Sequence, residues 1–138
     1  MIHSDYMEKS IDIESRIDNI NKIEKFIDEF SEVNEINSEI YGKILIATVE
    51  AVNNSIVHGN KEDVNKRVYI TLKIEGNKII ISIEDEGEGF DYSSVPDPTK
   101  PENVENIHGR GIYLMKHLAD NVSFDKEGKV VLMEFNKS

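Results

Sequence analysis

The chain has 138 residues, of which 38% are hydrophobic and 31% charged, a composition typical of one globular domain with its own core. It contains no cysteine, which excludes disulfides, thiolate metal sites and a thiol nucleophile. The formal charge of −11 disfavours nucleic-acid binding, because neutralising phosphates requires clustered lysine and arginine.

The sequence also lacks the apolar segments that direct a chain to a membrane. No apolar run approaches the ~20 residues of a membrane-spanning helix, and residues 1–9 contain no apolar signal core. We therefore expect a cytoplasmic protein, with no membrane association and one domain over residues 1–138.

The first part of the chain predicts one short strand followed by two helices. Residues 10–14 alternate weakly and suit an edge strand. Over residues 15–33, apolar side chains recur at steps of three and four, which predicts an amphipathic helix. A second helix is expected over about residues 37–57.

Residues 68–74 and 78–85 alternate between apolar and polar side chains, which predicts a β-hairpin turned at Gly76. All three prolines fall in the next stretch, residues 91–108, which is polar and has few apolar residues. Such a stretch cannot bury itself, so we expect a long loop there.

The last part of the chain predicts a third helix, over residues 111–119, and a second hairpin formed by residues 121–125 and 129–135. Helices that alternate with hairpins indicate an α+β fold. We expect a two-layer α/β sandwich, with a mostly antiparallel, mixed sheet that carries its helices on one face.

A row of polar residues follows the second helix, because Glu50, Asn54 and His58 recur every four residues. The row lies nearly opposite an expected apolar stripe of Leu45, Val49, Val52 and Ile56. A carboxylate in such a row can polarise an attacking hydroxyl, and a carboxamide oxygen can ligate magnesium. The same spacing also suits a solvated polar face, and His58 suits a structural or capping role near a helix end.

Asp85 ends the second strand with the same parity as its buried isoleucines, so its carboxylate is expected to point toward the core. A buried carboxylate requires a hydrogen-bond donor, and the exocyclic amino group of adenine is a suitable one. Gly87 and Gly89 would let a purine and its sugar lie against the backbone. An acidic glycine turn after a strand explains the same residues without a ligand.

Gly109-Arg110-Gly111-Ile112 is expected to open the third helix, whose N-terminus offers N–H donors and a positive dipole end to an anion. Arg110 can bind phosphate through two hydrogen bonds, and His108 can assist it. A glycine-rich cap with surface side chains fits the segment equally well. A Rossmann fingerprint is excluded because Leu114 stands where the third glycine belongs.

Together, and in this order, the three segments resemble the N box, G1 box and G2 box of the GHKL superfamily of ATPases and kinases, which share the Bergerat ATP-binding fold. Within it, residues 10–136 resemble the bacterial anti-sigma-factor serine/threonine kinases. The segment Glu50-Ala-Val-Asn-Asn54-Ser-Ile-Val-His58-Gly59 carries most of this resemblance.

The resemblance implies that Glu50 is a general base, that Asn54 ligates Mg²⁺, and that Asp85 reads adenine. The family's ATP lid corresponds to residues 91–108. The residues expected at the ATP site are Asn54, His58, Asp85, Gly87, Gly89, Gly109, Arg110, Gly111 and Ile112.

The resemblance further implies a Ser/Thr kinase that uses ATP and Mg²⁺ to phosphorylate a STAS-domain anti-anti-sigma protein. It implies a sigma factor as a second partner and a homodimer as the assembly. The alternatives are a non-catalytic, ATP-dependent binding switch and a stand-alone ATPase. Glu50 favours the enzyme, because a switch has no need of a base.

Overall fold

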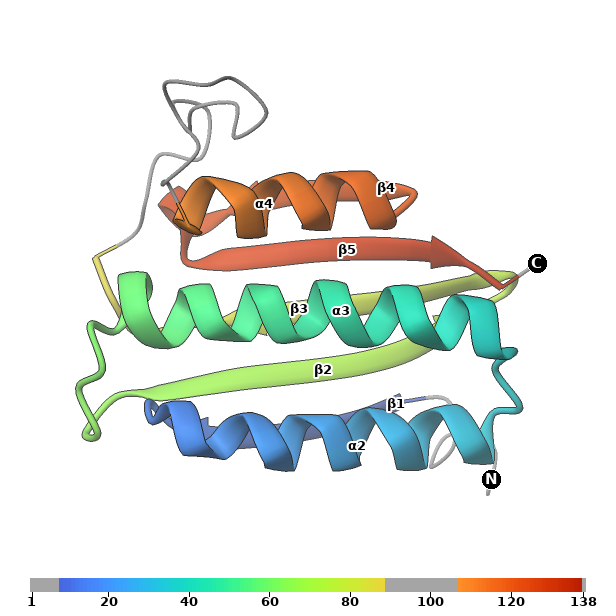
Figure 1. Cartoon of the computed structure of the whole chain (residues 1–138), viewed down its shortest axis with the longest axis horizontal. Helices are drawn as coiled ribbons and strands as arrows, with labels where there is room; N and C mark the ends of the chain where they lie inside the picture. Colours follow the sequence, from blue (N-terminus) through green and yellow to red (C-terminus); the bar gives the residue numbers. More distant parts are fainter. Residues whose placement is uncertain (1–7, 89–106, 138) are drawn as a thin grey trace.

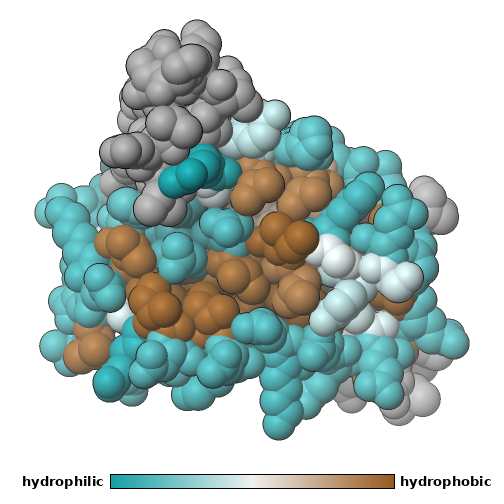
Figure 2. Space-filling model, viewed as in Figure 1, coloured by the Kyte–Doolittle hydropathy of each residue, from teal (hydrophilic) through white to brown (hydrophobic). Residues whose placement is uncertain are grey.

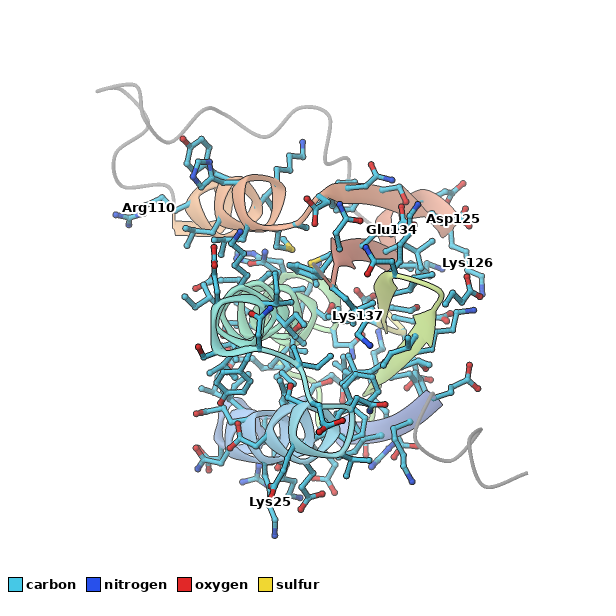
Figure 3. The ribbon with its side chains drawn as sticks, turned by 90° about the vertical axis from the view of Figure 1, so that its right-hand side faces the viewer. Lys25, Arg110, Asp125, Lys126, Glu134 and Lys137 are labelled. Atoms are coloured by element: carbon cyan, nitrogen blue, oxygen red, sulfur yellow. The ribbon has the colours of Figure 1, made fainter. Side chains whose placement is uncertain are left out.

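The computed structural model describes residues 8–88 and 107–137, and this part of the chain forms two layers (Figures 1 and 3). One layer is a five-stranded sheet in the order β1-β2-β3-β5-β4. The other consists of three α-helices that lie on one face of the sheet. Each of the four strand pairings is antiparallel. The expected α+β sandwich is confirmed, and the described sheet contains only antiparallel pairs.

The bounds of the elements follow the sequence pattern closely. The strands are β1 (Glu8–Glu14), β2 (Arg67–Glu75), β3 (Lys78–Glu84), β4 (Asn121–Asp125) and β5 (Val130–Asn136). The helices are α2 (Ile20–Val33), α3 (Ser38–Asn54) and α4 (Ile107–Leu118). A 3₁₀ turn (Ile17–Asn19) leads into α2, a π-helical turn (Ser55–Gly59) extends α3, and a second 3₁₀ turn (Lys126–Gly128) joins β4 to β5.

The central hairpin of β2 and β3 shows why the alternating pattern forms a sheet. Leu72 lies opposite Ile81, and Ile70 lies opposite Ile83, so apolar partners share the face that the helices cover. Gly76 turns the hairpin with a φ of +60°, a conformation that glycine adopts without steric cost. β1 lies at the edge of the sheet, as its weak pattern indicated.

The middle helix, α3, lies between α2 and α4 (Figure 1), and this position changes which of its residues are buried. The predicted stripe is only partly correct: Val52 and Ile56 are buried, whereas Leu45 and Val49 are half-buried. The buried α3 residues are Ile44, Ala47, Thr48, Ala51, Val52 and Asn54. Because helices cover two sides of α3 and the sheet a third, its buried surface is broader than one amphipathic stripe.

Two helix starts differ from the sequence prediction. The first helix was expected from residue 15, but Ser15 is buried and donates a hydrogen bond to the Lys66 carbonyl at 2.6 Å, and α2 begins only at Ile20. The third helix was expected from Gly111, but α4 begins at Ile107. Gly111 therefore lies inside α4 rather than at its N-terminus. Residues 89–106, with Gly89 and most of the expected lid, lie outside the described residues.

Apolar side chains gather along the middle of the helix-bearing face, and polar side chains surround them (Figure 2). On α3, Ile46 is exposed and Leu45 is half-buried. None of the helices in the described part of the chain is long and apolar enough to cross a membrane.

Candidate nucleotide site

Glu50 and Asn54 lie one turn apart on α3 and face the same residue of α4. A Cβ atom at Gly111 would lie 2.9 Å from Oε2 of Glu50 and 3.3 Å from Nδ2 of Asn54. Asn54 is only 3% exposed, and burial raises the pKa of the half-buried Glu50 carboxyl. The fold thus brings the first and third segments into contact, and Gly111 is the residue that allows their close approach.

Asp85 follows β3 directly and is 4% exposed, so the direction predicted from strand parity is correct. Its backbone N–H donates to the Lys129 carbonyl at 3.0 Å, and Gly87 N–H donates to its Oδ1 at 2.9 Å. Burial raises the pKa of this carboxyl, while the Gly87 hydrogen bond and the Lys129 charge partly oppose that effect. The site thus holds a carboxylate that has lost most of its hydration and bonds to one described N–H.

Gly59 joins the first segment to the second, although it is not among the predicted site residues. A Cβ atom at Gly59 would lie 2.4 Å from Oδ2 of Asp85, and one at Gly87 would lie 1.9 Å from the Gly59 carbonyl oxygen. Neither position can hold a side chain without moving the backbone or the carboxylate. The signal for Gly59 is its place one residue after His58, and it is the last residue of the π-helical turn.

Asn60 is a second residue that was not predicted near the site. It follows the π-helical turn and is 1% exposed. Its side chain bonds to three segments: Ser15 Oγ, the Arg67 carbonyl and the Glu86 N–H. Residues 60–66 read as a polar loop in the sequence, and nothing in that composition marks which polar side chain is buried.

The remaining predicted site residues differ in how they are placed. His58 lies on the π-helical turn and is exposed, and partial burial lowers the pKa of its imidazole. Arg110 is exposed and points away from the body of the protein (Figure 3). Ile112 is 2% exposed and packs in the core. Gly109 lies in the first turn of α4, two residues after the helix begins.

The arrangement of Asn54 fits the expected Mg²⁺ ion. Its carboxamide lies beside the Glu50 carboxylate in the space that the missing Gly111 side chain leaves. Within residues 8–88 and 107–137, no group of three or more acidic, histidine or cysteine side chains is placed to hold a metal ion. An ion bound by one carboxamide oxygen, with water and phosphate oxygens as its other ligands, agrees with the usual coordination of Mg²⁺.

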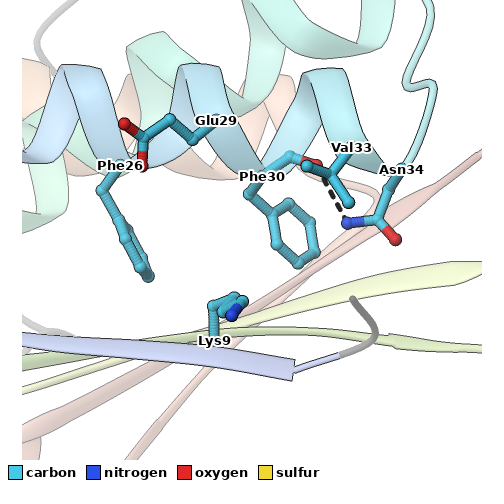
Figure 4. A pocket seen from close by; sticks show the side chains of 6 residues that line it. All are labelled: Lys9, Phe26, Glu29, Phe30, Val33 and Asn34. Atoms are coloured by element: carbon cyan, nitrogen blue, oxygen red, sulfur yellow. Dashed lines mark hydrogen bonds between the residues drawn. The ribbon is translucent and has the colours of Figure 1, made fainter. Parts of the chain in front are cut away.

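A separate hollow lies between β1 and α2, lined by Lys9, Phe26, Glu29, Phe30, Val33 and Asn34 (Figure 4). Its floor is mainly apolar, and the Asn34 amide is occupied by a hydrogen bond to the Phe30 carbonyl at 2.9 Å. Among the described residues of the three motif segments, none lines this hollow. β1 lies at one edge of the sheet, whereas Asp85 follows the central strand.

Comparison with known proteins identifies the fold family. Residues 13–135 match the family model of the histidine kinase-like ATPase domain. The chain belongs to this family. The expected GHKL resemblance is thereby confirmed, over almost the same residues as the sequence indicated.

Among curated relatives, the chain is similar to the anti-sigma F factor of Bacillus subtilis (strain 168), with 32% identity over 110 residues, 77% of this chain and 66% of that protein. It is also similar to the serine-protein kinase RsbW of Staphylococcus aureus (strain JH9), with 36% identity over 94 residues, 63% of this chain and 59% of the relative. The matches therefore span 66% and 59% of these relatives' own length, less than two thirds in both cases.

Among solved structures, the fold is similar to a crystal structure of the RsbU and RsbW domains of a Mycobacterium tuberculosis protein. The TM-score is 0.68, and the match covers 94% of this chain and 31% of that one, with 14% sequence identity. At this identity the likeness shows the shared fold alone.

Proposed function

We propose that this chain is an anti-sigma factor and an ATP- and Mg²⁺-dependent serine/threonine protein kinase that phosphorylates a STAS-domain anti-anti-sigma protein. The observation that carries the proposal is the contact of Glu50 and Asn54 with Gly111, because it places a partly desolvated carboxylate beside a metal-binding carboxamide. Membership of an ATPase family, and relatives named as an anti-sigma factor and a serine-protein kinase, support it.

In this proposal the adenine end of the nucleotide lies at Asp85. The carboxylate is buried and accepts an N–H from Gly87, and it would accept a second hydrogen bond from the exocyclic amino group of adenine. Gly59 and Gly87 carry no side chain to fill the space beside it. The same carboxylate would repel the carbonyl of a 6-oxopurine, so the proposal predicts that ATP binds more tightly than GTP.

The phosphate end lies at Glu50 and Asn54. A bound Mg²⁺ ion would supply charge neutralisation for the phosphate oxygens, with the Asn54 carboxamide as its protein ligand. The serine or threonine hydroxyl of the partner attacks the γ-phosphorus, the bond to the bridging oxygen breaks, and ADP leaves. Glu50 accepts the hydroxyl proton. Its raised pKa makes it a stronger base than an exposed glutamate.

The proposal extends to assembly and regulation. We infer a cytoplasmic homodimer that binds either a sigma factor or an unphosphorylated STAS-domain partner, so that the partner sequesters the kinase and frees the sigma factor. Phosphorylation of the partner would reverse this exchange. The formal charge of −11 suits a basic surface on a protein partner.

The direct test is incubation of the protein with labelled ATP, Mg²⁺ and each STAS-domain protein of the same genome. We expect label on a serine or threonine of one of them, and no label when Mg²⁺ is chelated. Binding of a STAS protein that requires ATP but yields no labelled product would replace the kinase with a non-catalytic switch. Release of free phosphate without any labelled protein would indicate a stand-alone ATPase.

A further inference from the structure

Asn60 uses its side chain to join three segments of the chain at one end of the sheet. Nδ2 donates to Ser15 Oγ at 2.8 Å and to the Arg67 carbonyl at 3.0 Å. Oδ1 accepts the Glu86 N–H at 2.8 Å. Ser15 lies just after β1, Arg67 begins β2, and Glu86 lies just after β3. A buried amide with both its donor and acceptor sides occupied fixes its neighbours, since breaking either bond leaves an unpaired buried group.

The third of these bonds connects the two segments that carry the adenine-reading carboxylate. Asn60 directly follows Gly59, and Glu86 directly follows Asp85, so one side-chain bond links the two backbones beside the carboxylate. The Asn60 N–H also donates to the Ser55 carbonyl at 2.8 Å, which ties the same residue to the end of α3.

The spacing at this junction leaves little tolerance. A methyl group would be too large at either Gly59 or Gly87, because it would lie 2.4 Å from Asp85 Oδ2 or 1.9 Å from the Gly59 oxygen. A small shift of the Glu86 backbone would therefore move the neighbouring Asp85 carboxylate against Gly59 or away from the adenine amino group. The position of the carboxylate therefore depends on what holds Glu86: its backbone N–H donates to Asn60 Oδ1, and its own carboxylate accepts the Arg67 N–H.

We propose that Asn60 is a positioning residue, whose Oδ1 bond to the Glu86 N–H sets the place of the Asp85 carboxylate for adenine recognition. This inference rests on the proposed ATP site, and Asn60 itself contacts no nucleotide in it. Among the side chains that fit here, asparagine supplies two donors and an acceptor at this length, whereas serine is too short and aspartate lacks the donors.

A purely structural role for Asn60 makes a different prediction, which two nucleotides can separate. Purine riboside triphosphate has hydrogen where ATP has the exocyclic amino group, so it cannot donate to Asp85. Loss of folding stability alone would change the apparent affinity for both nucleotides by the same factor and leave their ratio unchanged. A displaced Asp85 would weaken ATP and leave the affinity for purine riboside triphosphate nearly unchanged.

The experiment measures both dissociation constants by calorimetry, with Mg²⁺, at a temperature where circular dichroism shows each variant folded. The wild type is expected to prefer ATP by at least about tenfold, the value of a charge-assisted hydrogen bond. Asn60→Ala should reduce that preference to within about threefold of unity, as Asp85→Asn does. Asn60→Asp keeps the acceptor for Glu86, so it should keep the preference while unfolding at a lower temperature.

Asn19→Ala is the matched control, because Asn19 is also buried and its Nδ2 donates to a backbone carbonyl, that of Glu14, at 2.9 Å. It should lose thermal stability and keep the full ATP preference. A wild-type preference in Asn60→Ala, or an equal loss in Asn19→Ala, would overturn the positioning role.

If Asn60→Ala does not fold, Asn60→Asp is the test. A retained ATP preference in this variant supports the positioning role of the bond to the Glu86 N–H, and a lost preference overturns it. Failure of the proposed ATP site would give a different result from failure of the Asn60 inference. A wild type that binds both nucleotides equally would refute adenine recognition by Asp85 and this inference with it. A wild-type preference that Asp85→Asn abolishes and Asn60→Ala retains would refute this inference alone.

Discussion

At the scale of single residues, the site holds two carboxylates that are costly to bury. Burial raises the pKa of both Glu50 and Asp85, because an ionised group loses favourable hydration in the protein. Neither side chain takes part in an ion pair among the described residues within 4.0 Å. Groups placed at such a cost in the free protein are candidates for ligand contact rather than for stabilisation of the fold.

Asp85→Asn is expected to stabilise the nucleotide-free protein at neutral pH. The pKa of Asp85 is raised in the folded state, so its contribution to stability is present below the unfolded pKa and is lost as the pH rises through the folded pKa. The asparagine variant does not suffer this loss. Urea unfolding should therefore show an advantage of the variant at about pH 7 that shrinks toward about pH 4.

Asp18→Asn, which removes one charge at an exposed aspartate of the first 3₁₀ turn, is the control for the change in net charge. An advantage of Asp85→Asn that grows as the pH falls would contradict the assigned burial cost.

The residues of the site were predictable to different degrees, for physical reasons. The burial of Asp85 was predicted correctly because strand parity fixes side-chain direction. Asn60 was missed because its burial depends on Ser15 and Glu86, which lie 45 and 26 residues away in sequence. Ile112 was also predicted in the ATP site; its side chain packs in the core, and its role in the site stays a prediction.

At the scale of elements, the proposed phosphate end of the site lies where α3 and α4 pack together. The helix period predicted the row of Glu50 and Asn54, but the partner helix was expected to start at Gly111 and instead starts at Ile107. The reason is that glycine weakens a helix only modestly, and the packing gained at the α3–α4 contact offsets this cost. A prediction of helix bounds from the local sequence cannot account for packing against another helix.

Gly111→Ala tests this contact. Alanine favours a helix over glycine by roughly 0.5–1 kcal/mol, but its methyl group would lie 2.9 Å from Glu50 Oε2. The carboxylate must move, so we expect a folded protein of similar thermal stability in which phosphoryl transfer falls by about tenfold or more. Thermal unfolding and a transfer assay on the same preparation check both parts.

Gly42→Ala is the matched control, since Gly42 also lies within a helix, α3, and an added Cβ would meet no atom within 4 Å beyond its chain neighbours and the adjacent helix backbone. It should raise stability by about 0.4–1 kcal/mol and leave transfer unchanged. Equal activity of the two variants would show that the gap at Gly111 has no role in catalysis.

At the scale of the whole molecule, the proposed site draws on segments that lie far apart in the sequence. The end of α3, the exit of β3 and the first half of α4 all contribute, and the sheet order β1-β2-β3-β5-β4 brings them to one region. A ligand that bridges these segments binds only the folded chain, so it should stabilise the entire domain rather than one loop.

Mg–ATP should therefore raise the melting temperature of the wild type. At a free concentration 100 times the dissociation constant, the added stability is about 2.7 kcal/mol, which corresponds to a shift of several degrees in a domain of this size. Asp85→Asn should show a much smaller shift at the same concentration. A full ATP-dependent shift in this variant would place adenine recognition elsewhere.

The most direct test of the proposed kinase is a comparison of ATP affinity and phosphoryl transfer in Glu50→Gln. Glutamine keeps the shape of the side chain and removes the proton acceptor, so the dissociation constant for ATP should stay within about threefold of the wild type. Single-turnover transfer to the STAS-domain partner should fall by ~10²–10⁴-fold. Transfer at the wild-type rate by this variant would contradict the assignment of Glu50 as the base.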